Sequence, residues 1–192
     1  SLIIAGNSPM GKKLAKEAND GTLTWKDLND AKWGLESTSS AAGYMYPSQW
    51  LTENFKHSIR DLKNTVTMDS YDSAMAQLAS GQIDVMPEYA DARMDDAAKW
   101  TTTFGAKESI WDDTNVIGVT PAIANDGIMV SEKSKIMTAD FKKALSAAIK
   151  DMAKTDEGKK VIAIYSHDGY VDSTKADFKT AIKVANSMSK AN

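Results

Sequence analysis

The chain has 192 residues, 42% of them hydrophobic and 26% charged, which is enough to bury one large domain or two small lobes. Its net charge is −3, and its 23 basic residues are scattered among 26 acidic ones, so no basic stripe predicts binding to nucleic acid or to an anionic membrane. The absence of cysteine excludes disulfides, thiolate metal sites and a cysteine nucleophile. The longest apolar runs are too short to span a bilayer.

The first part of the chain alternates short apolar runs with amphipathic ones. Such alternation predicts an α/β fold with a mostly parallel sheet. We predict strands at residues 2–5, 33–35, 64–68, 83–86, 116–119 and 127–131, and helices at residues 9–19, 24–30, 42–55, 70–79 and 87–100.

From residue 138 onward the pattern is helical only. Apolar residues recur at intervals of three and four in residues 140–153, 156–165 and 175–189, with no strand between them. The kind of element therefore changes near residues 126–131, and we predict a boundary there.

Four consecutive hydroxyl side chains, Ser37, Thr38, Ser39 and Ser40, lie between a predicted strand and a predicted helix. A helix start leaves backbone N–H groups without intrahelical acceptors and carries the positive end of the helix dipole. Two interpretations follow. The serines cap the helix, or the hydroxyls and amides together hold an oxyanion.

Several motifs then resemble, in their order along the chain, the phosphonate/phosphate-type substrate-binding proteins of ABC transporters. The resemblance extends from about Leu2 to about Met188. It is carried by the hydroxyl loop with residues 43–47, and by residues 70–75, 79–85, 123–130, 155–160 and 169–170.

The resemblance implies a type II periplasmic-binding-protein-like fold, in which two α/β lobes are joined by two crossing strands and grip the ligand between them. Residues 1–126 would then be lobe two with the ligand loop, including the first crossing strand. Residues 127–192 would be the second crossing strand and the C-terminal helices of an incomplete second lobe, lobe one. The N-terminal part of lobe one is expected to be missing from this sequence, which leaves one wall of the cleft incomplete.

The resemblance also implies the site residues. The family's serine-threonine-serine-glycine-tyrosine run, which binds phosphonate oxygens, is matched here by residues 40–44, where Ala41 and Ala42 replace two hydroxyl residues. Tyr71 stands where the family has a histidine, and Glu88 is the nearest candidate for an acidic residue that faces a ligand amine. The expected ligand-binding residues are Ser37, Thr38, Ser39, Ser40, Ala42, Gly43, Tyr44, Tyr71 and Glu88.

Other interpretations stay open at this stage. Glu88 also fits the first turn of a predicted helix, and together with Asp91, Asp95 and Asp96 it would suit a carboxylate-dependent hydrolase that recruits a divalent cation. The two histidines, His57 and His167, are predicted to lie at the surface. The same two-lobe architecture serves as the effector-binding domain of transcription regulators, but no DNA-binding module is encoded here.

The sequence therefore predicts a non-enzymatic solute receptor of an ABC importer. Its partners would be a small anionic or zwitterionic solute and an ABC permease, with no nucleic acid, cofactor or metal. It would work at the periplasmic or extracellular face of the cytoplasmic membrane, and it would touch the membrane only through a lipid anchor or the permease.

Overall fold

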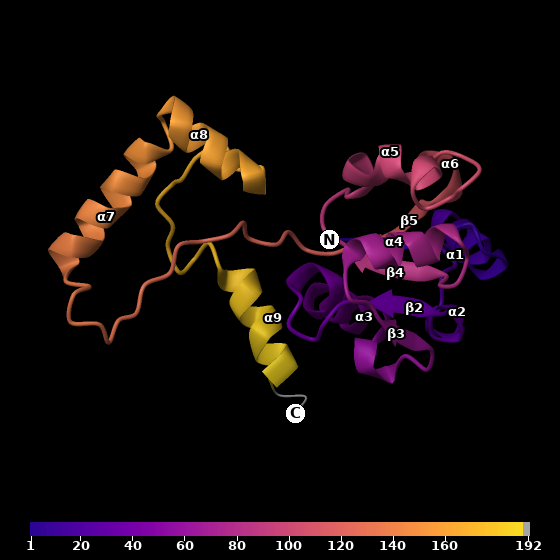
Figure 1. Ribbon diagram of the computed structural model, residues 1–192. Coiled ribbons are helices and arrows are strands. Elements are labelled where there is room, and N and C mark those ends of the chain that lie inside the picture. Colours follow the sequence, from indigo (N-terminus) through magenta and orange to yellow (C-terminus); the bar gives the residue numbers. More distant parts are fainter. Residues whose placement is uncertain (190–192) are drawn as a thin grey trace. The chain divides into compact units, whose positions relative to one another are not determined.

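The computed structural model describes residues 1–189 and divides into two compact units (Figure 1). Unit 1 contains residues 1–123 and the C-terminal helix that begins at Lys179, and unit 2 contains residues 124–178. Among the described residues, no helix combines the length and the apolar character needed to cross a bilayer. The predicted assignment of residues 1–126 and 127–192 to two lobes stays a prediction.

Unit 1 is built on a five-stranded sheet with the order β3-β2-β4-β1-β5. Its strands are β1 (Leu2–Ala5), β2 (Trp33–Leu35), β3 (Thr65–Thr67), β4 (Val85–Glu88) and β5 (Asn115–Val119). β2 pairs in parallel with β3 and β4, whereas β1 pairs antiparallel with β4 and β5. The sheet is therefore mixed, where the sequence predicted a mostly parallel one. Alternating elements indicate the direction of the later strands, but not that β1 inserts between β4 and β5.

The helices of unit 1 begin where the sequence offers a hydroxyl cap. Ser8, Thr24, Ser70 and Ser109 each accept a hydrogen bond from a backbone N–H in the first turn of the helix that follows. The helices are α1 (Pro9–Asn19), α2 (Trp25–Asp30), α3 (Tyr46–Phe55), α4 (Tyr71–Ala79), α5 (Arg93–Thr102) and α6 (Ile110–Asp113), with a π-helical turn at Ala41–Met45 and a 3-10 turn at Ile59–Asp61.

Two apolar cores flank the sheet. Because side chains alternate along β1, this strand contributes residues to both cores. Ile3 and Ala5 pack with residues of α1, α2 and α3, whereas Ile4 packs with residues of α4, α5 and α6. Figure 1 shows these helices beside the strands that they cover. Both faces of the sheet are buried, which accounts for the continuous apolar character of β1.

Three predicted elements differ from the structure. Pro87 lies in β4 rather than at the start of a helix, and α5 begins only at Arg93. β4 pairs with β2 only at Val85, so the missing backbone N–H of Pro87 costs no hydrogen bond to β2. The predicted strand at residues 127–131 does not form, because no strand of the described chain pairs with it, and Met129 is 93% exposed. The last predicted helix begins at Lys179, four residues late.

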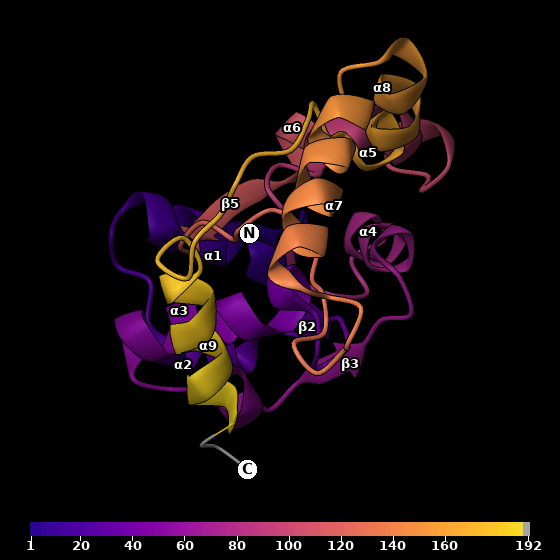
Figure 2. The ribbon, with the colours of Figure 1, turned by 90° about the vertical axis from the view of Figure 1, so that its left-hand side faces the viewer.

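Unit 2 contains two capped helices and little buried surface. Its helices are α7 (Ala139–Met152) and α8 (Asp156–Ile162), and α8 runs into a 3-10 turn at Ala163–Tyr165 (Figure 2). Thr138 and Thr155 cap the two helices. α7 contributes no fully buried residue, so its amphipathic pattern is not matched by a core within this unit.

The last helix, α9 (Lys179–Ser189), packs on unit 1. Val184 is buried, and Met188 packs against the apolar core to which α3 contributes. The Ser187 hydroxyl donates to Gln49 Oε1 at 3.2 Å, and Lys183 Nζ lies 2.9 Å from a carboxylate oxygen of Glu53. Apolar burial and these polar contacts fix α9 beside α3.

Asp84 joins the starts of the two strands that lead to the candidate site. Its carboxylate accepts hydrogen bonds from Ser8 Oγ at 2.5 Å and from the Lys32 backbone N–H at 2.7 Å. Its own backbone N–H donates to the Lys32 carbonyl at 2.8 Å. The residue therefore sets the position of β4 relative to β2 and to the start of α1.

We expect Asp84→Ala to lower the free energy of unfolding of unit 1 by about 1 to 2 kcal/mol, because the part-buried Ser8 hydroxyl and the exposed Lys32 N–H both lose their acceptor. Urea unfolding followed by tryptophan fluorescence measures this, since all five tryptophans lie in residues 1–123. Glu108→Ala, at an exposed position of the same unit, is the control and should change stability by less than about 0.5 kcal/mol. Equal losses in the two variants would contradict the role of Asp84.

Candidate ligand-binding site

The candidate site lies where three neighbouring strands end. β2, β3 and β4 run parallel, so their carboxyl ends meet at one edge of the sheet. The hydroxyl loop follows β2, Tyr71 begins the helix after β3, and Glu88 is the last residue of β4. The sheet thus brings together three segments that are far apart in the sequence.

A π-helical turn at residues 41–45 opens the helix after the hydroxyl loop. The Ser40 hydroxyl accepts a hydrogen bond from the Gly43 N–H at 3.0 Å, and the Met45 N–H donates to the Ser40 carbonyl at 3.0 Å. The turn continues directly into α3, so the amides of its first residues, Ala42 among them, lie at the positive end of a long helical segment. These amides supply donors for an oxyanion.

Tyr71 and Ser40 meet across the site. Their hydroxyl oxygens lie 3.3 Å apart, within hydrogen-bond distance. The Tyr71 ring packs edge-on against the Tyr89 ring with centroids 5.4 Å apart, and the Tyr89 hydroxyl donates to Asp95 at 2.9 Å. Burial raises the pKa of Tyr71, so its hydroxyl stays protonated and available as a donor.

Glu88 is fully buried at the end of β4, and neither carboxyl oxygen has a hydrogen-bond partner among residues 1–189. Burial, followed by the nearby charges of Asp96 and Glu36, raises the pKa of Glu88 to about 9. The side chain is therefore a neutral acid at neutral pH. The alternative interpretation of Glu88 as a first-turn helix carboxylate is wrong, because the residue lies in a strand.

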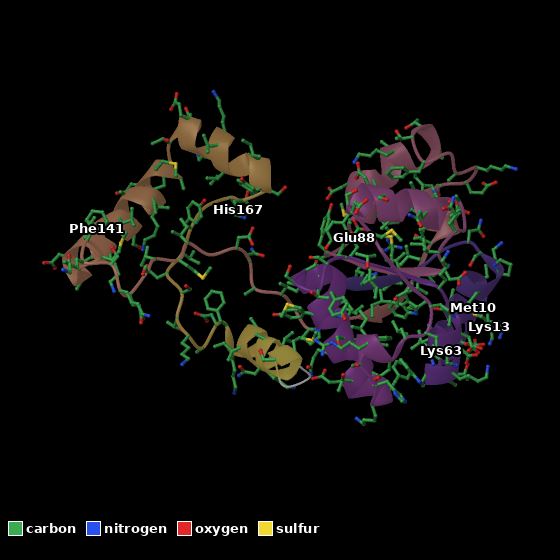
Figure 3. All side chains as sticks on the ribbon, turned by 60° about the horizontal axis from the view of Figure 1, so that its bottom comes forward. Met10, Lys13, Lys63, Glu88, Phe141 and His167 are labelled. Atoms are coloured by element: carbon green, nitrogen blue, oxygen red, sulfur yellow. The ribbon has the colours of Figure 1, made fainter. Side chains whose placement is uncertain are left out.

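Two cations of α5 are bound to carboxylates other than Glu88. Lys99 lies 3.1 Å from Asp72 and 3.2 Å from Asp96, and the Arg93 guanidinium binds the carboxylate of Asp91. Figure 3 places Glu88 on the opposite side of unit 1 from Lys13 and Lys63.

Three of the predicted site residues face elsewhere. Ser37, Thr38 and Ser39 are exposed, and the hydroxyls of Ser37 and Ser39 lie 3.1 Å apart. Ser37 and Thr38 line a cavity of about 230 Å³ together with Arg60 and other residues of the β3 side. The structure thus brings Ser40 next to Tyr71, with Gly43 in the turn that Ser40 caps and Glu88 near Tyr71. The Tyr44 side chain instead lines the cavity with Ser37 and Thr38.

One residue beside the turn, Glu36, was missed from the sequence. A buried oxygen of Glu36 and the Tyr46 hydroxyl have no hydrogen-bond partner in the described part of the chain. A Cβ added at Gly43 would lie 2.4 Å from Glu36 Cγ, so the glycine admits the Glu36 side chain beside the turn. Gly43 within a helix start was the one sequence signal of such a close approach.

The other polar candidates lie outside this group. His57 stacks on Trp25 with ring centroids 4.2 Å apart, and His167 lies in unit 2 among aromatic rings of that unit. Asp91 is bound by Arg93, as described above. Within residues 1–189, no group of three histidine or acidic side chains is arranged to hold a metal ion.

Solved structures and one family model resemble this chain. A binding protein component of an ABC phosphonate transporter from Pseudomonas aeruginosa superposes with a TM-score of 0.63 at 16% identity, covering 98% of this chain and 57% of its own. PhnD1 from Prochlorococcus marinus, solved in complex with methylphosphonate, gives 0.64 at 15% identity, covering 98% of this chain and 66% of its own. This chain therefore spans less than two thirds of either protein. At these identities the likeness shows the fold, that of periplasmic binding proteins.

No similar sequence is found among curated proteins. The family model described as "ABC transporter, phosphonate, periplasmic substrate-binding protein" matches residues 5–178, which is most of the chain. The chain therefore belongs to the family of periplasmic phosphonate-binding proteins of ABC transporters.

Proposed function

We propose that this chain forms the ligand-holding part of a solute receptor for an ABC importer, and that it binds a small phosphonate-like or phosphate-like anion. In this role the Ser40 hydroxyl, the amides of Ala42, Gly43 and Tyr44, and the Tyr71 hydroxyl hold the anion. Ser37, Thr38 and Ser39 extend this set if the loop shifts on binding. Glu88 closes the same site and meets an amine in ligands that carry one.

The observation that carries the proposal is the convergence of donors at the π-helical turn. Ser40 both caps the turn, by accepting from the Gly43 N–H, and reaches Tyr71, so two hydroxyls lie together at the start of the turn. Such an arrangement stabilises an oxyanion without requiring a nearby cation. The family match favours a receptor over the effector domain of a regulator or a carboxylate-dependent hydrolase.

The burial of Glu88 supports the same location. A carboxyl group without a partner reduces the stability of the folded chain, and groups of this kind concentrate at functional sites.

The rest of the importer follows from the family. The receptor would present its solute to an ABC permease at the periplasmic or extracellular face of the cytoplasmic membrane. It would catalyse no reaction, and a lipid anchor would be its own means of attachment to the membrane.

We expect Ser40→Ala and Tyr71→Phe each to weaken binding of methylphosphonate about tenfold, because each removes one hydroxyl from the anion. Isothermal titration calorimetry measures the dissociation constants. Ser80→Ala, which removes an exposed hydroxyl at the end of α4, is the matched control and should leave the affinity unchanged. Wild-type affinity in both site variants would show that the π-helical turn does not hold the anion.

We expect the folded chain to lose stability as the pH rises through the window from about 4.5 to about 9. Glu88 keeps its proton in the folded state across this window and loses it in the unfolded state, so the free energy of unfolding falls by up to about 1.4 kcal/mol per pH unit. Glu88→Gln removes this contribution, and the variant should be the more stable protein near pH 8. Urea unfolding at about pH 5.5 and pH 8 tests this, and equal pH dependence in both proteins would show that Glu88 is ionised in the fold.

A further inference from the structure

A cavity of about 230 Å³ lies beside β3, the edge strand of the sheet. It is enclosed by the end of β2 with the hydroxyl loop, by the 3-10 turn that begins at Ile59, and by β3 itself. Ser40, Tyr71 and Glu88 are not among its lining residues, so the cavity is a different place from the anion site proposed above. Its occupant has to match its own walls.

The inner wall of the cavity is apolar and belongs to a core. Leu35, Tyr44, Ile59 and Leu62 line it, and all four are buried members of the core cluster that also contains residues of α1, α2 and α3. Protein cores leave few voids larger than a water molecule, because unfilled space loses dispersion contacts. A gap of this size at the margin of a packed core is therefore a recess that suits a small apolar group.

The outer wall of the cavity is polar. Thr65 and Thr67 lie two residues apart on β3, so both face the cavity, whereas Val66 between them packs against the other core. The exposed residues that complete the rim are Ser37, Thr38 and Arg60. An apolar interior with a few polar groups at its entrance is the usual composition of a site for a small molecule.

The charges of the lining limit what the cavity can hold. Arg60 is its basic residue and Glu36 is its acidic one. Burial, followed by the charge of Asp69, raises the pKa of Glu36, which favours the neutral acid and reduces its repulsion of an anion. A guanidinium group pairs best with a planar carboxylate. A dianion such as phosphate would exceed the single positive charge of the lining and would leave the apolar wall uncovered.

We propose that this cavity is a second binding site, which takes a small monocarboxylate with a compact apolar body. The body packs on the buried side chains of the inner wall, and the carboxylate meets Arg60 and the threonine hydroxyls at the rim. An apolar cavity of about 150 Å³ is large enough for benzene, so the volume of about 230 Å³ admits a benzene ring that carries a carboxylate. This site is independent of the proposed function.

Benzoate is the probe, and NMR titration of the isotope-labelled chain measures its binding. We expect saturable binding with a dissociation constant below about 1 mM, and shift changes at the amides of Leu35, Leu62 and Thr67 but not at Glu88. Acetate lacks the apolar body and benzyl alcohol lacks the charge, so each should bind at least about tenfold more weakly.

Three results of this titration would overturn the inference. They are the absence of saturation by about 10 mM benzoate, shift changes centred on Tyr71 and Glu88, and binding of acetate or benzyl alcohol as tight as that of benzoate.

Variants of the rim locate the site. We expect Arg60→Gln to weaken benzoate binding about tenfold, because the carboxylate loses its charged partner. Lys63→Gln is the matched control, since Lys63 is an exposed base of the same segment that lies 3.9 Å from Asp30 and does not line the cavity. Thr65→Phe places a ring at the rim and should abolish binding. Wild-type affinity in Arg60→Gln, or an equal loss in Lys63→Gln, would contradict the proposal, and the wild-type ligand series decides the question even if a variant does not fold.

Methylphosphonate separates this site from the anion site. We expect Tyr71→Phe to weaken methylphosphonate binding but not benzoate binding, and Arg60→Gln to do the reverse. Displacement of benzoate by methylphosphonate would show that the two ligands share one site, and the inference would fail. If benzoate binds in the cavity and methylphosphonate does not bind at all, the proposed function fails and the second site stands.

Discussion

The parallel pairing of β2 with β3 and β4 is the constraint on which the site depends. It ends three strands at one edge of the sheet, so that the hydroxyl loop, Tyr71 and Glu88 meet although they are far apart in the sequence. Asp84 fixes the other ends of β2 and β4 through hydrogen bonds to Ser8 and Lys32. Rigid strand ends are what allow short polar side chains to converge on one point.

The site combines groups that stabilise the fold with groups that reduce its stability. Ser40 satisfies a backbone donor of the π-helical turn, as a helix cap does in any protein. Glu36 and Glu88 keep buried oxygens without partners in the described chain, which the folded state tolerates only because the two cores beside the sheet supply enough burial. Two interpretations of the serine loop, helix cap and anion site, are therefore compatible in Ser40.

The sequence was a sound guide to elements with strong local signals. The capped helices α1, α2 and α4 begin where Ser8, Thr24 and Ser70 predict. The prediction at Pro87 was wrong, because a proline that follows an apolar run fits two structures. It fits the first turn of a helix, and it also fits a strand at a position where the neighbouring strand no longer pairs. The strand expected at residues 127–131 needs a pairing partner, and an apolar run alone carries no information about one.

The sequence by itself determined the types of most elements, the hydroxyl loop at a helix start, and the family resemblance. Caps, periodicity and motifs are local, and a reader can find them without the fold. Only the tertiary structure decided that β1 lies between β4 and β5, that Ser40 rather than Ser37 reaches Tyr71, and that Glu88 and one oxygen of Glu36 are buried. These features arise from contacts between distant segments, where burial and charge together set the protonation state of a carboxyl group that the sequence shows only as a glutamate.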